Sequence, residues 1–113
     1  MTAATKVAPA VITEVLSLRA AKSHTRRCQN SYKRQTQRAG IAAAVFEAAI
    51  AKGDNSVMTQ NSLNAARHQQ AFALRLFDSL ESDIAKLDAQ IAVLIEEGTR
   101  IEARRAAEKE ANR

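Results

Sequence analysis

The strongest constraint on this chain is a heptad seam toward its C-terminal end. Apolar residues recur at alternating steps of three and four from Phe77 to Ile101, and the residues between them are almost all polar. This spacing predicts a long helix that packs along another helix, because it keeps one apolar stripe facing the partner. The seam consists of Phe77, Leu80, Ile84, Leu87, Ile91, Leu94, Gly98 and Ile101.

The composition favours helices throughout. Among 113 residues there are three glycines and one proline, so few positions favour a turn, and much of the 46% hydrophobic content is alanine. Such a chain cannot bury a large globular core, whereas long helices packed side by side can form from it. We therefore predict an all-α fold, a long antiparallel two-helix hairpin or coiled coil, in a single domain over residues 1–113.

Turn signals set the expected boundaries. Pro9 suits the first turn of a helix, and Gly53 suits the left-handed cap that ends one. These signals predict a first helix over about 8–52, a turn over 53–62 and a second helix over about 63–107.

Three local features of this hairpin follow from single residues. Thr59, Asn61 and Ser62 are each candidate N-caps of the second helix. Gly40 costs about 1 kcal/mol relative to alanine inside a helix, so the alternative fold is a short four-helix bundle divided there. Residues 1–6 are expected to fray.

The charge differs between the two halves. Residues 1–52 hold nine basic and two acidic residues, whereas residues 53–113 hold eight basic and ten acidic ones. Acidic residues predominate beside the seam, so a parallel pair of these helices would repel, and a basic antiparallel first helix would be attracted. A fold-back near residue 54 places residue i opposite about 109 minus i. The positions beside the seam are Glu81, Asp83, Asp88, Gln90, Ile95, Glu97, Glu102 and Arg104.

The first helix offers a thinner seam. Small or polar residues fill half of its predicted positions, so the hairpin buries little area, and a second copy or a different partner is expected to complete it. The predicted positions are Leu18, Ala21, Thr25, Cys28, Tyr32, Ala39, Ala42, Phe46 and Ala49.

No catalytic, cofactor or metal site is predicted. His24 and Cys28 share a helix face, but no third group follows to orient them, and a zinc site needs about four ligands. The neighbouring Glu96 and Glu97 lie on an exposed face, and no glycine-rich phosphate loop is present. We therefore expect a protein that is not an enzyme.

Two surfaces are candidates for binding. No acidic residue lies between Glu14 and Glu47, where seven basic residues gather and Tyr32 is the single aromatic before Phe46. This tract suits pairing with the acidic helix or an acidic protein partner, and nucleic acid is the alternative ligand. The apolar run Ile41–Ala51 beside the turn forms either a local core or a partner-docking surface. The partner-binding hypothesis comprises Arg26, Arg34, Arg38, Phe46, Ile50, Phe72 and Leu76.

The expected location is the cytoplasm, without membrane insertion. A single cysteine, Cys28, excludes an intrachain disulfide and fits a reducing compartment. The most apolar run, Ile41–Ala51, contains Glu47 and is far shorter than the roughly 18 to 20 residues that span a bilayer.

The chain resembles the small coiled-coil stalk proteins of type III secretion and flagellar export. The resemblance lies in the opening Val15–Arg19, the basic first helix, the midpoint turn and the segment Arg67–Phe72 followed by regular heptads. It covers most of the chain and is one of pattern. It implies a helical hairpin that binds a secretion ATPase ring, with an export-gate component and chaperones as further partners. A virion or other scaffold component is a further alternative.

Overall fold

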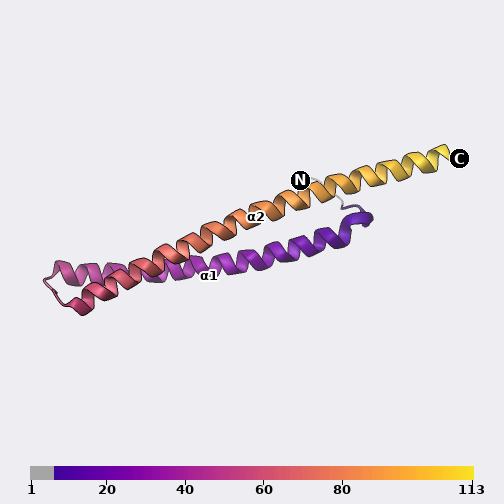
Figure 1. Cartoon of the computed structure of the whole chain (residues 1–113). Coiled ribbons are helices and arrows are strands. Elements are labelled where there is room, and N and C mark those ends of the chain that lie inside the picture. The colour runs from indigo at the N-terminus through magenta and orange to yellow at the C-terminus, as the bar shows by residue number, and fades with distance from the viewer. Residues whose placement is uncertain (1–6) are drawn as a thin grey trace. The chain divides into compact units, whose positions relative to one another are not determined.

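The structure is a computed structural model that describes residues 7–113. Two long helices, α1 (Ile12–Ala51) and α2 (Val57–Ala111), follow a short 3-10 turn, η1 (Pro9–Val11) (Figure 1). No strand occurs among these residues. The chain is therefore an all-α helical hairpin, as predicted, while the fraying predicted for residues 1–6 lies outside the described residues.

Helix α1 passes through Gly40 without interruption, so the alternative of a first helix divided there is wrong. Gly40 faces the side chain of Gln70 on α2. A Cβ atom at this position would lie 2.8 Å from the side-chain nitrogen of Gln70. A glycine at this position therefore leaves α1 unbroken, and a Cβ atom would fit there only if the flexible side chain of Gln70 moved.

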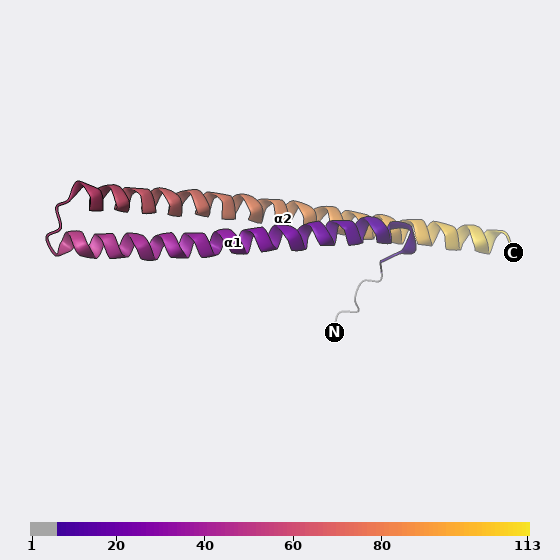
Figure 2. The same ribbon diagram turned by 90° about the horizontal axis from the view of Figure 1, so that it is seen from below.

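Contacts divide the chain into two compact units. Unit 1 comprises the described part of Met1–Thr25 together with Asp83–Arg113, and unit 2 is Arg26–Ser82. Within each unit a segment of α1 lies beside a segment of α2 that runs in the opposite direction, and the turn belongs to unit 2 (Figure 2). One domain over residues 1–113 stays a prediction.

The end of α1 is a Schellman cap. Gly53 has φ of 104°, and its N–H donates to the carbonyl of Ile50 at 3.0 Å. The N–H of Asp54 donates to the carbonyl of Ala49 at 3.1 Å. Glycine takes this left-handed conformation without a steric cost, so the predicted role of Gly53 is confirmed.

The second helix is longer than predicted at both ends. It begins at Val57, well before the end of the predicted turn over 53–62, and it ends at Ala111 rather than near residue 107. Its N-cap is Ser56, whose Oγ accepts the N–H of Thr59 at 3.1 Å. The three later residues predicted as caps therefore lie inside α2, because Ser56 already satisfies the N–H of Thr59, the third residue of the helix.

Asp54 completes the cap of α2. Its carboxylate accepts the backbone N–H of Ser56 at 2.9 Å and the hydroxyl of Thr59 at 2.8 Å. These hydrogen bonds, the backbone bond of Ser56 foremost, hold the pKa of Asp54 below its ordinary value of 3.8. The first polar residues of the segment that was predicted as a turn thus form the cap of α2.

The core of unit 2 consists mainly of alanine. Ala43, Leu63 and Ala66 are buried together near the turn, and half-buried Phe46 and Ile50 pack against them. The other buried hydrophobic residues of this unit are also alanines. Unit 2 therefore brings its two helices close together while burying few large side chains.

A buried glutamine joins the two helices of unit 2. Gln29 is 1% exposed, and its side-chain nitrogen donates to the carboxylate of Glu81 and, at 3.4 Å, to the carbonyl of Phe77. Its side-chain oxygen accepts a hydrogen bond from the guanidinium of Arg26 at 2.7 Å. Both polar atoms of the amide have partners, as burial requires.

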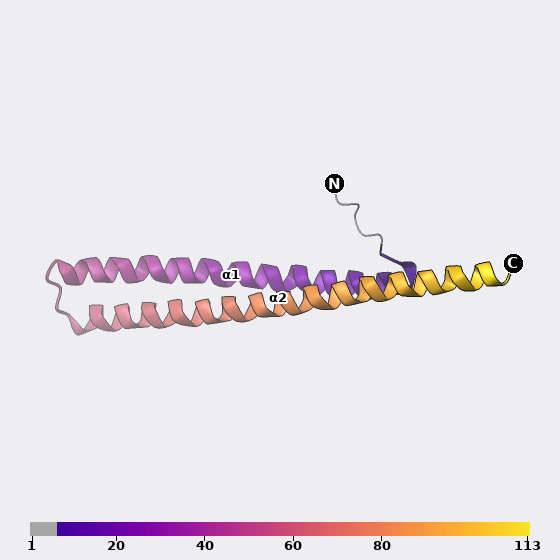
Figure 3. The same cartoon turned by 90° about the horizontal axis from the view of Figure 1, so that it is seen from above.

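Unit 1 has its own apolar cluster where the chain enters α1. Ala8, Val11 and Val15 are buried with Ile91 of α2. Gly98 allows this approach, because a Cβ atom there would lie 2.6 Å from Val11 and 3.0 Å from the Cβ of Ala8. Beyond this cluster α2 continues past the start of α1 (Figure 3), and residues 103–113 are all exposed.

The seam of α1 differs from the predicted one. Of the predicted positions, Ala21 is exposed, and Cys28, Ala42 and Ala49 are half-buried at the edge of the seam. Polar residues that were not predicted there occupy several seam positions. Lys22 does so with its ammonium 2.7 Å from the carboxylate of Asp88, and buried Gln29 does so through its hydrogen bonds. Together with Ala8 and Val11, which precede α1, the seam is Val15, Leu18, Lys22, Thr25, Gln29, Tyr32, Thr36, Ala39, Ala43, Phe46 and Ile50.

The heptad seam of α2 is the covered face of that helix. Ile84 is 2% exposed and Ile91 is 9% exposed. The half-buried members of the predicted set are Phe77, Leu80, Leu87, Leu94 and Ile101. The same phase extends back toward the turn through Leu63, Ala66, Gln70 and Ala73.

Candidate functional site

The two sides of the helix pair in unit 2 differ sharply in charge. On one side, Glu47 and Arg67 form an ion pair of 2.8 Å, and Arg26 and Glu81 form one of 3.3 Å. Their side chains are about half exposed, so each pair contributes only about 0.2 to 1 kcal/mol. We call this side the paired flank, defined by these four residues, and its main effect is to fix the register of the helices.

The opposite side carries one charged side chain among its central residues, that of Arg38. Large apolar side chains are exposed on it: Met58 by 80%, Val45 by 60% and Phe72 by 57%. We call this side the weakly charged flank, and it has contributions from both helices. It comprises Gln35, Arg38, Ala42, Val45 and Ala49 of α1 with Met58, Ala65, Gln69, Phe72 and Leu76 of α2.

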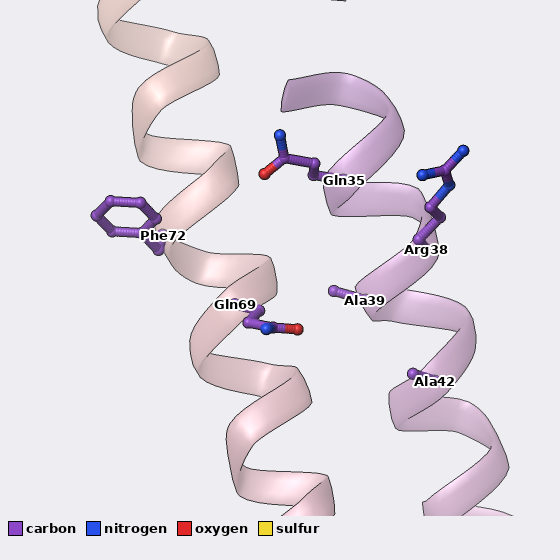
Figure 4. A pocket seen from close by; sticks show the side chains of 6 residues that line it. All are labelled: Gln35, Arg38, Ala39, Ala42, Gln69 and Phe72. Atoms are coloured by element: carbon purple, nitrogen blue, oxygen red, sulfur yellow. The ribbon is translucent and has the colours of Figure 1, made fainter. Parts of the chain in front are cut away.

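A groove lies along the weakly charged flank. It has a volume of about 430 Å³. Alanines on α1 form its low wall, and the ring of Phe72 stands on α2 at its edge, pointing away from α1 (Figure 4). The groove is lined by Gln35, Arg38, Ala39, Ala42, Gln69 and Phe72.

The outer row of α1 is a second exposed surface. Arg27, Arg34 and Ile41 recur at seven-residue intervals along it, and Ile41 is 67% exposed. Within residues 7–113, neither arginine forms an ion pair, and the same holds for Arg38 at the border with the weakly charged flank. Some basic side chains of α1 thus pair with carboxylates of α2, whereas Arg27 and Arg34 are exposed to solvent.

The structure separates the residues predicted to bind a partner into three groups. Arg26 is bound to Glu81 on the paired flank. Phe46 and Ile50 cover the buried cluster near the turn, so they form the local core that was the other interpretation of this run.

The remaining predicted residues lie at the surface. Phe72 is exposed and Leu76 is half-buried on the weakly charged flank. Arg34 lies on the outer row, and Arg38 lies at its border. The prediction missed Met58 and Val45, although their spacing of seven residues from Ala65 and Arg38 places them on the same faces.

Neither a metal-binding cluster nor a membrane-spanning helix occurs among the described residues. His24 is exposed and Cys28 is half-buried. Over residues 7–113, no group of three or more histidine, cysteine or acidic side chains could hold a metal ion. Neither described helix has a stretch both long and apolar enough to cross a membrane.

Comparisons with protein-family models, with curated proteins and with solved structures find no match to this chain.

Proposed function

We propose that this chain is a non-enzymatic structural adaptor that packs against an acidic protein partner within a larger assembly. The observation that supports this proposal is the division of its cations. Lys22 and Arg26 pair with carboxylates of α2, whereas Arg27 and Arg34 on the outer row have no ion-pair partner in the described part of the chain.

The outer row has the chemistry that an acidic amphipathic helix requires. Arg27 and Arg34 supply positive charge, and exposed Ile41 supplies an apolar contact on the same row. Helices commonly bind such surfaces through residues on one face, with charge setting orientation and rate of association. The partner we propose therefore presents carboxylates and an aliphatic side chain on one helical face.

A stalk of a type III secretion or flagellar export ATPase, acting in the cytoplasm, is the specific assembly we favour. Its support is the sequence resemblance together with the helical hairpin. The partner would then be the ATPase ring, and the chain would contribute to protein transport through helix packing alone.

Nucleic acid is the second candidate partner, because unpaired arginines on a helix can equally neutralise phosphates. Tyr32 argues against it. This residue is half-buried in the seam of α1, so its ring cannot serve as an open platform for a base.

The two candidates are separated by a charge reversal on the outer row. We expect a fluorescent acidic amphipathic peptide to bind the full chain, and Arg27→Glu with Arg34→Glu to abolish that binding. Arg104→Glu with Arg105→Glu is the matched control, because these arginines lie in the exposed C-terminal segment of α2, residues 103–113, away from the outer row of α1. Fluorescence anisotropy measures both.

The same variants are tested with poly(dT) and duplex DNA. Binding to nucleic acid that falls by orders of magnitude between about 50 and 200 mM salt, and that requires Arg27 and Arg34, would replace the acidic partner with the nucleic-acid alternative. Peptide binding that survives reversal of both arginines would contradict the proposed use of the outer row.

A further inference from the structure

We propose that the weakly charged flank of unit 2 binds a second copy of this chain, so that two hairpins form an intermolecular four-helix bundle. The core of unit 2 buries mainly alanine, whereas Val45, Met58 and Phe72 on this flank are 57 to 80% exposed. Full burial of a side chain of this size contributes about 1.5 to 3 kcal/mol. Covering the flank would therefore bury three large apolar side chains that the hairpin leaves in contact with water.

The flank has the features of a specific interface rather than of a scattered apolar surface. A standard interface buries roughly 800 Å² on each partner around a few large apolar anchors. This flank offers three such side chains, from both helices, beside a groove of about 430 Å³. A second copy supplies a surface of the same size and chemistry, because a two-fold dimer uses one patch on both subunits.

The flank is complementary to itself. A two-fold axis parallel to the helices would place α2 of one copy over α1 of the other at the same level. Phe72 lies at the level of the groove between Ala39 and Ala42, since these residues line one hollow. Phe72 of each copy can then enter the groove of the other, as a side chain of one helix fits between those of its neighbour.

Charge favours this arrangement over two others. Facing α1 to α1 would bring the two copies of Arg38 together, whereas facing α1 to α2 brings Arg38 near a Phe72 ring, where a cation is favourable. Association through the paired flank would instead bury the Glu47–Arg67 and Arg26–Glu81 pairs, and removing such charges from water is costly. The weakly charged flank avoids both costs.

Sedimentation equilibrium of the full chain tests the dimer. Across about 1 to 100 μM protein, we expect a mass near twice 12.3 kDa at the upper concentrations. Phe72→Glu should weaken association by at least about 30-fold, as for a central aromatic anchor. Val45→Glu tests the α1 side of the same flank, and its exposed position tolerates the change in the folded chain.

Leu74→Glu is the matched control. Leu74 is 48% exposed on the same helix but lies toward the paired flank, so we expect a change of less than about threefold. A monomer at every concentration, or equal effects of Phe72→Glu and Leu74→Glu, would overturn the proposal. The acidic partner binds a different row, so each of the two proposals can fail without the other.

Cross-linking tests the axis. A benzoylphenylalanine at position 72, in a mixture of ¹⁴N and ¹⁵N chains, should form mixed-isotope adducts with residues 35–42 of the other copy. Adducts confined to a single chain, or mixed adducts with the paired flank, would overturn the proposed arrangement.

Discussion

Two glycines inside the helices offer a matched test of how closely α1 and α2 pack. Replacing an interior helical glycine with alanine contributes about 1 kcal/mol through helix propensity alone. At Gly40, the added Cβ would meet the nitrogen of Gln70 at 2.8 Å, but this atom ends a flexible side chain and can move. We therefore expect Gly40→Ala to raise the free energy of unfolding by up to about 1 kcal/mol.

Gly98→Ala should have the opposite effect. Its Cβ would lie 2.6 Å from Val11 and 3.0 Å from the Cβ of Ala8, and both residues are buried in the cluster of unit 1. Overpacking of this kind costs about 1 to 3 kcal/mol, which exceeds or cancels the propensity gain. The net expectation is a loss of about 1 kcal/mol and a difference of about 2 kcal/mol between the two variants.

Circular dichroism at 222 nm during thermal unfolding measures both variants, at one protein concentration because self-association would shift the transition. For a chain of this length, 1 kcal/mol corresponds to roughly 4 °C in Tm. In a Val11→Ala background most of the penalty of Gly98→Ala should disappear, because the closest contact is removed. If Gly98→Ala stabilised the chain as much as Gly40→Ala, the close packing of η1 on α2 would be refuted.

Two further outcomes test the seam and the cap. In urea denaturation, Ile84→Ala should lower the free energy of unfolding by about 2 to 4 kcal/mol, because Ile84 is almost fully enclosed. Leu87→Ala should cost less, because Leu87 is half-buried, and equal losses would contradict this reasoning. The pKa of Asp54 lies below 3.8, so its stabilisation is complete above that pH and is lost as the pH falls through the lower folded value. The difference in Tm between the wild type and Asp54→Asn should therefore shrink on acidification from pH 4 toward pH 2, and a constant difference would exclude a contribution from the Asp54 charge.

The sequence predicted the features that depend on repetition and on special backbone conformations. The steps of three and four along α2 require a facing helix, and they place Ile84 and Ile91 on its covered side. Gly53 was predictable as a left-handed cap because few other residues take that conformation. The antiparallel register also follows from charge, and Lys22 meets Asp88 one residue from the predicted position.

What the sequence could not predict is which of several possible partners each polar side chain finds. Ser56 and the three predicted caps are all of residue types that favour N-caps. Hydrogen bonds with Asp54 and Thr59, both within three residues, select Ser56. The α1 seam was misplaced for a related reason. A polar residue at position 29 argues against a seam until Glu81 and the Phe77 carbonyl are known to face it.

The buried Gln29 also bears on why the chain exposes apolar side chains elsewhere. A polar residue in a coiled-coil seam contributes less stability than an aliphatic one, but it disfavours registers in which it lacks partners. Sliding α1 by one heptad would take Gln29 away from Glu81 and would separate Lys22 from Asp88. The register is thus fixed by polar contacts, and close approach is provided by alanines. The large apolar side chains of unit 2 are then not all required inside the hairpin, and Val45, Met58 and Phe72 remain available for association with another chain.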